Sequence, residues 1–174
     1  GMGGPSAAIV LHELAELGVR RAIRVGTCGA LDPSLELGQL LRVEAALPED
    51  GVSRALGAQG PQPADPELLG RLVAAGAGMP ATVATTDLFY EYTDAPRGGW
   101  IEAGATAVEM EACALFTLGP RLGLAVACLL VVTDVFPGGE RVRIEPEALE
   151  GSVQEMGRAA AAGREGGGDE RDLG

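Results

Sequence analysis

Apolar residues recur along the chain with two different periods, which predict helices and strands in alternation. Over residues 5–17 the apolar positions have roughly helical spacing, and Pro5 suits an early helical position. Residues 21–26 are a short, mostly apolar run that ends in Gly26, which predicts a strand closed by a glycine turn. Residues 124–132 are almost entirely apolar, as expected of a strand that is covered on both faces.

The rest of the pattern continues this alternation. Gly119-Pro120 interrupts an apolar run over residues 112–122, so we expect that helix to bend or end early. The other elements that the pattern predicts are strands over 39–47 and 81–86 and near Val108, helices over 67–77 and 146–162, a helix or loop over 95–104, and a loop over 50–66.

Strands that alternate with helices predict an α/β fold, here a three-layer αβα arrangement around a mixed central sheet. The length of 174 residues fits a single domain, which we place at residues 1–163. Residues 164–174 are glycine-rich and charged, and we expect them to form a disordered tail.

Composition narrows the class of protein. Hydrophobic residues make up 47% of the chain but aromatic residues only 3%, so the core must be aliphatic. The formal net charge of −12 argues against a nucleic-acid partner. Three cysteines without metal-site spacing indicate reduced, buried thiols and a cytoplasmic protein. The chain shows neither a signal peptide nor an apolar run long enough to span a membrane.

The segment Val108-Glu109-Met110-Glu111 carries the most informative chemistry. A carboxylate such as Glu111 can accept hydrogen bonds from two adjacent hydroxyls, which is how a ribose diol is held. A neighbouring methionine offers a soft apolar surface to a sugar face. Acidic residues are also common at helix starts, so this motif indicates a binding site only together with the other polar motifs of the chain.

Three further polar motifs are predicted to lie at strand ends, where ligands bind in α/β sheets. They are Arg24-Val25-Gly26-Thr27, Thr86-Asp87-Leu88-Phe89-Tyr90 and Thr133-Asp134. Taken singly, Arg24 could be a surface cation, Phe89 a core aromatic residue and Asp134 a helix N-cap. Taken together, the motifs favour one shared binding site.

These motifs, with Gly1-Met2-Gly3-Gly4-Pro5-Ser6 and Cys28-Gly29-Ala30, resemble those of the purine and uridine nucleoside phosphorylases over residues 1–162. The resemblance implies phosphorolysis of a ribonucleoside to a free base and ribose 1-phosphate, as in nucleoside salvage. It implies inorganic phosphate as co-substrate, without a cofactor or metal, and a homo-oligomer that binds no nucleic acid or membrane.

The resemblance also implies residue roles. Arg24 and Thr27 are expected to bind phosphate, and Asp134, assisted by Arg141, to act on the leaving base. The expected ribose-binding residues are Met2, Glu109, Met110 and Glu111, and the expected base-binding residues are Phe89 and Thr133.

Two features of the chain favour particular branches of the family. Arg24 favours a phosphorylase over a hydrolytic nucleosidase, because hydrolysis needs no phosphate-binding arginine. Residues 91–96 lack the Gln and Arg with which the uridine branch reads uracil, and Asp134 is present. Both observations favour a purine or methylthioadenosine-type nucleoside, and uridine phosphorylase stays as an alternative.

Members of the family usually begin some distance upstream of the Gly-Met-Gly-Gly motif. We therefore interpret the chain as an N-terminally truncated member that keeps its ribose and base residues but only part of its phosphate site. An inactive nucleoside-binding or oligomer-forming fragment is the remaining alternative.

Overall fold

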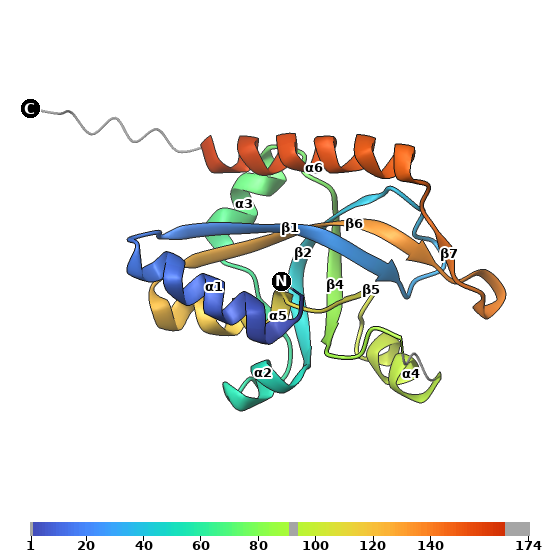
Figure 1. Ribbon diagram of the computed structural model, residues 1–174, viewed down its shortest axis with the longest axis horizontal. Coiled ribbons are helices and arrows are strands. Elements are labelled where there is room, and N and C mark those ends of the chain that lie inside the picture. The colour runs from blue at the N-terminus through green and yellow to red at the C-terminus, as the bar shows by residue number, and fades with distance from the viewer. Residues whose placement is uncertain (1, 91–93, 166–174) are drawn as a thin grey trace, which may run out of the picture.

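The computed structural model describes residues 2–90 and 94–165 of the chain and has an α/β architecture (Figure 1). In chain order, the elements are α1 (Gly4–Glu16), β1 (Arg21–Ala30), β2 (Leu40–Glu49), α2 (Gly51–Ala55), β3 (Gln62–Pro63), α3 (Pro66–Ala74), β4 (Met79–Thr86), α4 (Asp94–Glu102), β5 (Ala107–Glu109), α5 (Ala112–Leu118), η1 (Gly119–Leu122), β6 (Ala125–Val135), η2 (Pro137–Gly139), β7 (Val142–Arg143) and α6 (Pro146–Glu165).

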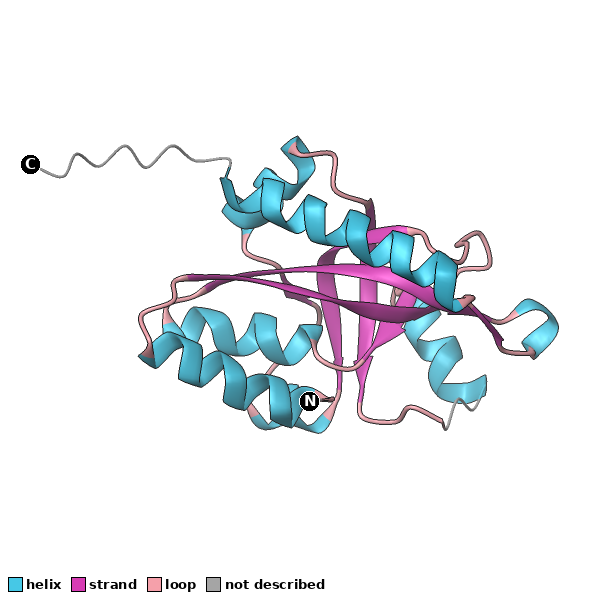
Figure 2. Ribbon diagram, turned by 45° about the horizontal axis from the view of Figure 1, so that its top comes forward, coloured by secondary structure: helices cyan, strands magenta, loops and turns pink. Residues whose placement is uncertain are grey.

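The described strands form one mixed sheet in the order β3-β2-β4-β5-β1-β6-β7. β1 runs parallel to β6 and antiparallel to β5, while β2 runs parallel to β4. An additional antiparallel pairing joins β2 to β6, so the sheet curls back on itself. Helices α3 and α6 cover one face, and α1, α2 and α5 lie on the other (Figures 1 and 2). This confirms the predicted three-layer fold with a mixed sheet.

Strand β6 is the centre of the hydrophobic core. Val126, Cys128, Leu130 and Val132 belong to the cluster on the α1 and α5 side of the sheet. The alternate residues Ala127, Leu129 and Val131 pack with α3 and α6. Both faces of the strand are therefore buried, as the unbroken apolar run predicted.

Two boundaries differ from the sequence prediction. The strand predicted for residues 21–26 extends to Ala30, because Gly26 is hydrogen-bonded within the sheet as the partner of Leu130 rather than forming a turn. The region 50–66, predicted as a loop, contains α2 and β3. The Asp50 carboxylate caps α2 by accepting a hydrogen bond from Ser53 N–H at 2.8 Å. Helix α2 is too short to show a periodic pattern in the sequence.

The remaining elements follow the predictions closely. α5 ends at Leu118, and the 3₁₀ helix η1 starts at Gly119, so the helix stops at the Gly-Pro pair as expected. α6 continues through residues 164 and 165, which were assigned to the tail. The rest of that predicted tail, residues 166–174, lies outside the described residues.

The glycine that directly precedes β4 packs closely against the backbone of β2. Gly78 has a φ of +66°, and a Cβ there would lie 2.9 Å from the Leu40 carbonyl oxygen. Gly78→Ala is therefore expected to lower the free energy of unfolding by about 2 kcal/mol or more, from both the disfavoured conformation and the clash. Urea denaturation of the variant measures this loss.

Gly76 provides the matched control for that substitution. Its φ is +67°, but a Cβ there would meet nothing within 4 Å. Gly76→Ala carries only the conformational cost of about 1 kcal/mol. Equal losses in the two variants would show that the close approach of Gly78 to β2 is unimportant.

Candidate active site

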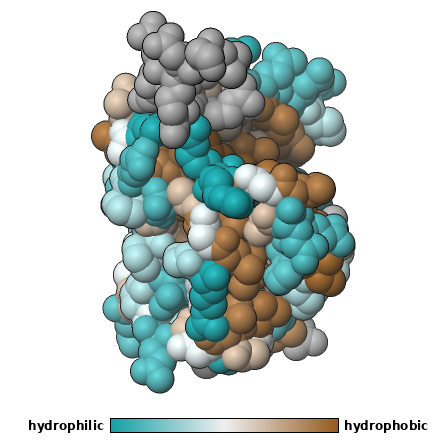
Figure 3. Space-filling view, turned by 90° about the vertical axis from the view of Figure 1, so that its left-hand side faces the viewer, coloured by the Kyte–Doolittle hydropathy of each residue, from teal (hydrophilic) through white to brown (hydrophobic). Residues whose placement is uncertain are grey.

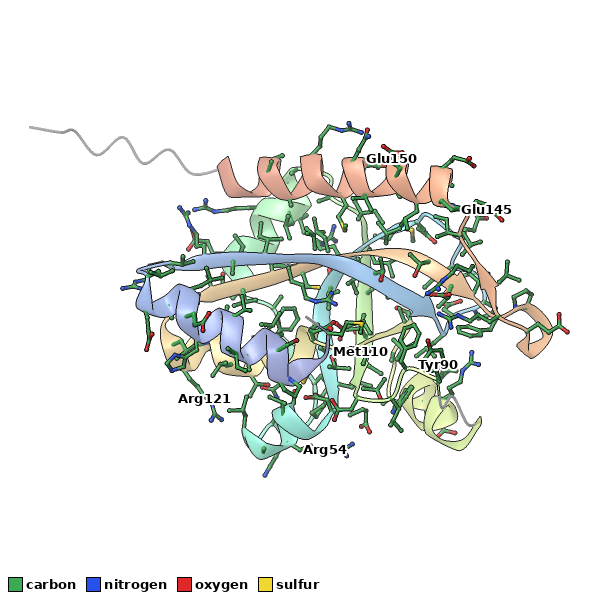
Figure 4. All side chains as sticks on the ribbon, in the orientation of Figure 1. Arg54, Tyr90, Met110, Arg121, Glu145 and Glu150 are labelled. Atoms are coloured by element: carbon green, nitrogen blue, oxygen red, sulfur yellow. The ribbon has the colours of Figure 1, made fainter. Side chains whose placement is uncertain are left out.

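A cleft of about 560 Å³ opens between α1, strand β1 and the ends of β4, β5 and β6. Met110, which follows β5, lies close to the middle of the molecule, and Tyr90 lies on the side of α4 (Figure 4). The cleft is lined by nine of the residues singled out from the sequence: Met2, Arg24, Thr27, Phe89, Glu109, Met110, Glu111, Thr133 and Asp134. The polar motifs of the sequence therefore line one cleft, and their joint role as a binding site stays a prediction.

Arg24 reaches the cleft from the middle of β1, not from the strand end that the sequence predicted. Its guanidinium group folds over Gly26, where a Cβ would lie only 2.6 Å from Arg24 Nη1. Any larger residue at position 26 would displace the arginine. Gly26 therefore makes room for a side chain and does not end the strand.

The Arg24 side chain is only 16% exposed and is held by buried partners. Nη2 donates a hydrogen bond to Glu111 Oε2 and lies 3.3 Å from Glu109 Oε2, while Nη1 contacts the Cys128 sulfur at 3.5 Å. Burial opposes the charged form, but Cys128 and the two carboxylates raise the pKa of Arg24 above its ordinary value. The cleft thus contains a permanent cation that is partly shielded from water.

Glu111 bridges the start of α1 and strand β1. Its Oε1 accepts a hydrogen bond from Gly3 N–H at 2.7 Å, and its Oε2 accepts from Arg24. An ionised carboxylate has about four lone-pair sites, so further acceptor capacity remains for two ligand hydroxyls. This geometry is compatible with the ribose-binding role predicted for Glu111.

Glu109 occupies a different environment from Glu111. Its side chain has no exposed surface and accepts hydrogen bonds from Thr85 Oγ1 and from the backbone N–H groups of Glu111 and Ala112. Burial raises the pKa of Glu109, an effect that Arg24 and these donors oppose. Because its oxygens are enclosed by protein donors, Glu109 holds Arg24 and the start of α5 in place. The predicted contact of Glu109 with the ribose stays a prediction.

Thr85 does not line the cleft but supports Glu109 from behind, a role that the sequence pattern does not predict. It is fully buried, donates to Glu109 and accepts a hydrogen bond from Cys113 N–H at 2.9 Å. The segment Thr82-Val83-Ala84-Thr85-Thr86 predicts only a strand. The alternation of that strand was the one signal that could have placed Thr85 beside the motif at residues 108–111.

Thr27 also lines the cleft, three residues beyond Arg24 on β1. Residues three apart in a regular strand point to opposite faces of the sheet. The shared contact of Arg24 and Thr27 with one phosphate stays a prediction.

Asp134 lies at the other end of the cleft, near the end of β6. Its Oδ1 accepts hydrogen bonds from Arg141 Nε at 2.7 Å and Arg143 Nε at 3.1 Å, and its Oδ2 accepts from Thr133 Oγ1 at 2.9 Å. Burial acts to raise the pKa of Asp134, but these donors outweigh it and lower the pKa. The arrangement stabilises the carboxylate form, and the role of Asp134 towards the leaving base stays a prediction.

This lowered pKa gives a testable pH dependence. A carboxylate whose pKa is lower in the folded state stabilises the fold above its unfolded-state pKa and loses that contribution as pH falls through the folded-state pKa. Asp134→Asn should therefore cost about 1–3 kcal/mol at pH 7, and the difference from wild type should shrink towards pH 3. Denaturant unfolding at several pH values measures it.

Val132→Ala, a core substitution without charge on the same strand, is the control for Asp134→Asn. Its cost should be similar at pH 7 and pH 3. A pH-independent cost of Asp134→Asn would mean that the ion pairs contribute nothing to stability.

The aromatic group of the cleft is Phe89. Its ring lies 5.0 Å from the Arg141 guanidinium carbon and packs edge-on against Tyr90 at 4.8 Å. Arg141 itself does not line the cleft, whereas Arg143, which the sequence analysis did not single out, does. Arg143 lies on a strand of two residues, too short to recognise from a pattern. Residues 91–93, part of the segment used to compare purine and uridine branches, lie outside the described residues.

The described residues form neither a metal-binding cluster nor a helix that could span a membrane. Within residues 2–90 and 94–165, there is no cluster of three or more His, Cys, Asp and Glu side chains arranged to hold a metal. Among the same residues, every helix is too short or too polar to cross a bilayer. Cys28, Cys113 and Cys128 are free and buried, as predicted. Burial raises the pKa of Cys113 to about 11 and that of Cys128 to about 12.

Comparison with known proteins gives a match to a family model over most of the chain. The model of the phosphorylase superfamily matches residues 1–162. All of the cleft residues described above fall within this range.

Individual relatives carry different substrate names. The chain is 34% identical over 147 residues to a guanosine phosphorylase of Halorubrum lacusprofundi, and the matched region makes up 81% of the chain and 61% of the relative. It is 34% identical over 158 residues to a DeoD-type purine nucleoside phosphorylase of Geobacillus kaustophilus, covering 86% and 66%. It is also 34% identical over 151 residues to a uridine phosphorylase of Thermococcus kodakarensis, covering 76% and 54%. The chain thus spans less than two thirds of the length of these relatives.

Proposed function

This chain belongs to the phosphorylase superfamily, and from that premise we propose that it cleaves the N-glycosidic bond of a ribonucleoside with inorganic phosphate. An oxygen of phosphate bonds to the anomeric carbon as the bond from that carbon to the base breaks. The electron pair of the broken bond stays with the base, which takes up the proton that the attacking hydrogen phosphate loses. The products are the free base and ribose 1-phosphate.

The observation that carries the proposal is the buried Arg24 in the cleft. A guanidinium group has five N–H donors, and those that do not face Glu109, Glu111 or Cys128 would donate to an anion. Arginine matches the geometry of phosphate oxygens better than lysine does. Arg24 is therefore the group proposed to bind phosphate, with the Thr27 backbone nearby.

Glu111 is the proposed ribose clamp, with Met2 and Met110 packing against the sugar. It lies next to Arg24, so a ribose on Glu111 would sit beside a phosphate on Arg24. The transition state of such a reaction carries positive charge on the sugar ring, which the Glu111 carboxylate stabilises. A carboxylate that is already oriented by Gly3 N–H and Arg24 needs little reorganisation when that charge develops.

A purine nucleoside is the proposed substrate, with Phe89 and Thr133 on the base side of the cleft. Asp134, Arg141 and Arg143 at the β6 end of the cleft support this assignment, because they offer hydrogen-bonding partners to the polar edge of a purine. Two relatives named above are described as acting on purine nucleosides or guanosine, and one on uridine. A methylthioadenosine-type nucleoside belongs to the same purine class.

A homo-oligomer in the cytoplasm is part of the proposal. Apolar surface is exposed between polar strips on the side of the molecule shown in Figure 3. Helix α1 contributes large exposed apolar side chains, Ile9, Val10 and Leu17, as expected of a surface that packs against another copy. Three free, buried cysteines fit a reducing compartment.

The test is release of free base from inosine, guanosine, adenosine, methylthioadenosine and uridine, each with and without phosphate. Phosphate-dependent release from purine nucleosides is the expected result. Release without phosphate would identify a nucleosidase, and preference for uridine would overturn the base assignment. Absence of release from all five, with nucleoside still bound, would identify a nucleoside-binding protein without turnover.

A further inference from the structure

Two arginines approach the same oxygen of Asp134, yet they are placed differently. Arg141 Nε is 2.7 Å and Arg143 Nε is 3.1 Å from Oδ1. Arg141 lies before β7 and also contacts the Phe89 ring, so it is fixed between two partners. Arg143 lies on β7 directly across from Asp134 in the antiparallel pairing with β6.

Arg143 is the arginine of this pair that lines the cleft. Its side chain is 61% exposed, and the hydrogen bond from Nε to Asp134 anchors one edge of the guanidinium group. The two Nη groups extend beyond this anchor. Because a guanidinium group is planar and rigid, fixing Nε also fixes the direction in which the Nη donors point.

The charges at this end of the cleft determine which ligand atoms can bind there. Asp134 already accepts hydrogen bonds from three donors, Thr133, Arg141 and Arg143. Arg143 is a donor only. The atoms that bind favourably next to it are therefore hydrogen-bond acceptors.

Purine bases differ in the atoms that they present on this edge. Guanine has two adjacent acceptors, N7 and O6, a pair that arginine characteristically binds in a bidentate manner. Hypoxanthine has the same two acceptors. Adenine has the N7 acceptor but carries an amino donor in place of O6, which would face a second donor on arginine.

We infer that Arg143 determines base specificity by donating to the N7 and O6 edge of a 6-oxopurine, so that guanosine and inosine are preferred over adenosine. This inference rests on the proposed function and specifies its substrate class. Asp134 acts as a positioning residue that orients Arg143. The negative charge that the departing base gains on losing the sugar is spread over N7 and O6, where Arg143 stabilises it.

The experiment compares guanosine with adenosine in wild type and in Arg143→Met, which keeps side-chain length but removes the donors. Wild type should favour guanosine by about tenfold in kcat/KM, and Arg143→Met should abolish this preference. Arg143→Lys, which restores a donor, should recover part of it. Binding of guanosine and adenosine without phosphate, measured by calorimetry, should show the same ratios.

Arg141→Met is the matched comparison, because Arg141 contacts the same carboxylate without lining the cleft. It should lower activity on both nucleosides by similar factors and leave their ratio unchanged. A ratio that Arg143→Met leaves intact, or equal use of both nucleosides by wild type, would overturn the inference while phosphorolysis stands. Preferential guanosine binding without phosphate-dependent cleavage would overturn the proposed function and leave the inference intact.

Discussion

Replacing Arg24 with methionine is expected to abolish phosphate-dependent base release and to lower the free energy of unfolding by about 3–5 kcal/mol. Methionine fills similar space but leaves the enclosed Glu109 carboxylate without its cationic partner. Removing one member of a buried ion pair is costly because the other charge stays desolvated. Urea denaturation measures the stability, and base release at increasing phosphate concentration measures the activity.

The stability of this variant should depend on pH in a defined direction. Burial raises the pKa of Glu109, and removing Arg24 removes a charge that opposes this effect. A carboxyl group with a raised pKa destabilises the fold at neutral pH, and the penalty disappears as pH falls through its folded-state pKa. The stability difference between wild type and Arg24→Met should therefore be smaller at pH 5 than at pH 7.

Two further variants test whether the unpaired Glu109 charge causes the loss of stability in Arg24→Met. Adding Glu109→Gln to Arg24→Met removes the buried charge and should recover part of the lost stability. Arg54→Met is the matched control, because Arg54 pairs with Glu49 at the surface, with 58% of its own side chain exposed, and should cost no more than about 1 kcal/mol. Equal losses in Arg24→Met and Arg54→Met would refute a buried, ligand-binding ion pair.

Glu111→Gln is expected to lower kcat/KM about 100-fold while the fold survives. Glutamine keeps the shape and can still accept the hydrogen bond from Gly3 N–H, but it lacks the charge that stabilises the developing positive charge on the ribose. The loss should therefore fall mainly on kcat, with a smaller change in the KM for nucleoside. Steady-state kinetics with saturating phosphate separates the two.

Glu150→Gln serves as the control for Glu111→Gln, since Glu150 is exposed on α6, on the opposite face of the sheet from α1 and α5 (Figures 1 and 4). It removes the same charge from the chain and should leave kcat/KM unchanged. Activity retained by Glu111→Gln would exclude Glu111 as the ribose clamp.

The local pattern of residues determined the elements of this fold and the membership of the site. A fully apolar run such as residues 124–132 has few options in water, and it folds as a strand buried on both faces. The Gly119-Pro120 pair ends α5 because proline lacks the N–H that a helix needs. The motifs around Arg24, Phe89, Glu111 and Asp134 each follow a predicted strand, and the carboxyl ends of parallel strands share one edge of a sheet, so their meeting in one cleft was predictable.

Tertiary structure alone decided what each of these side chains does. Glu109 and Glu111 are two residues apart, yet one is enclosed by Thr85 and backbone donors and the other faces the cleft, because the chain turns between β5 and α5. Arg143 reaches Asp134 only through the pairing of β7 with β6. Such roles depend on burial and on donors from distant segments, and these shift a pKa or enclose an oxygen in ways that no local sequence pattern records.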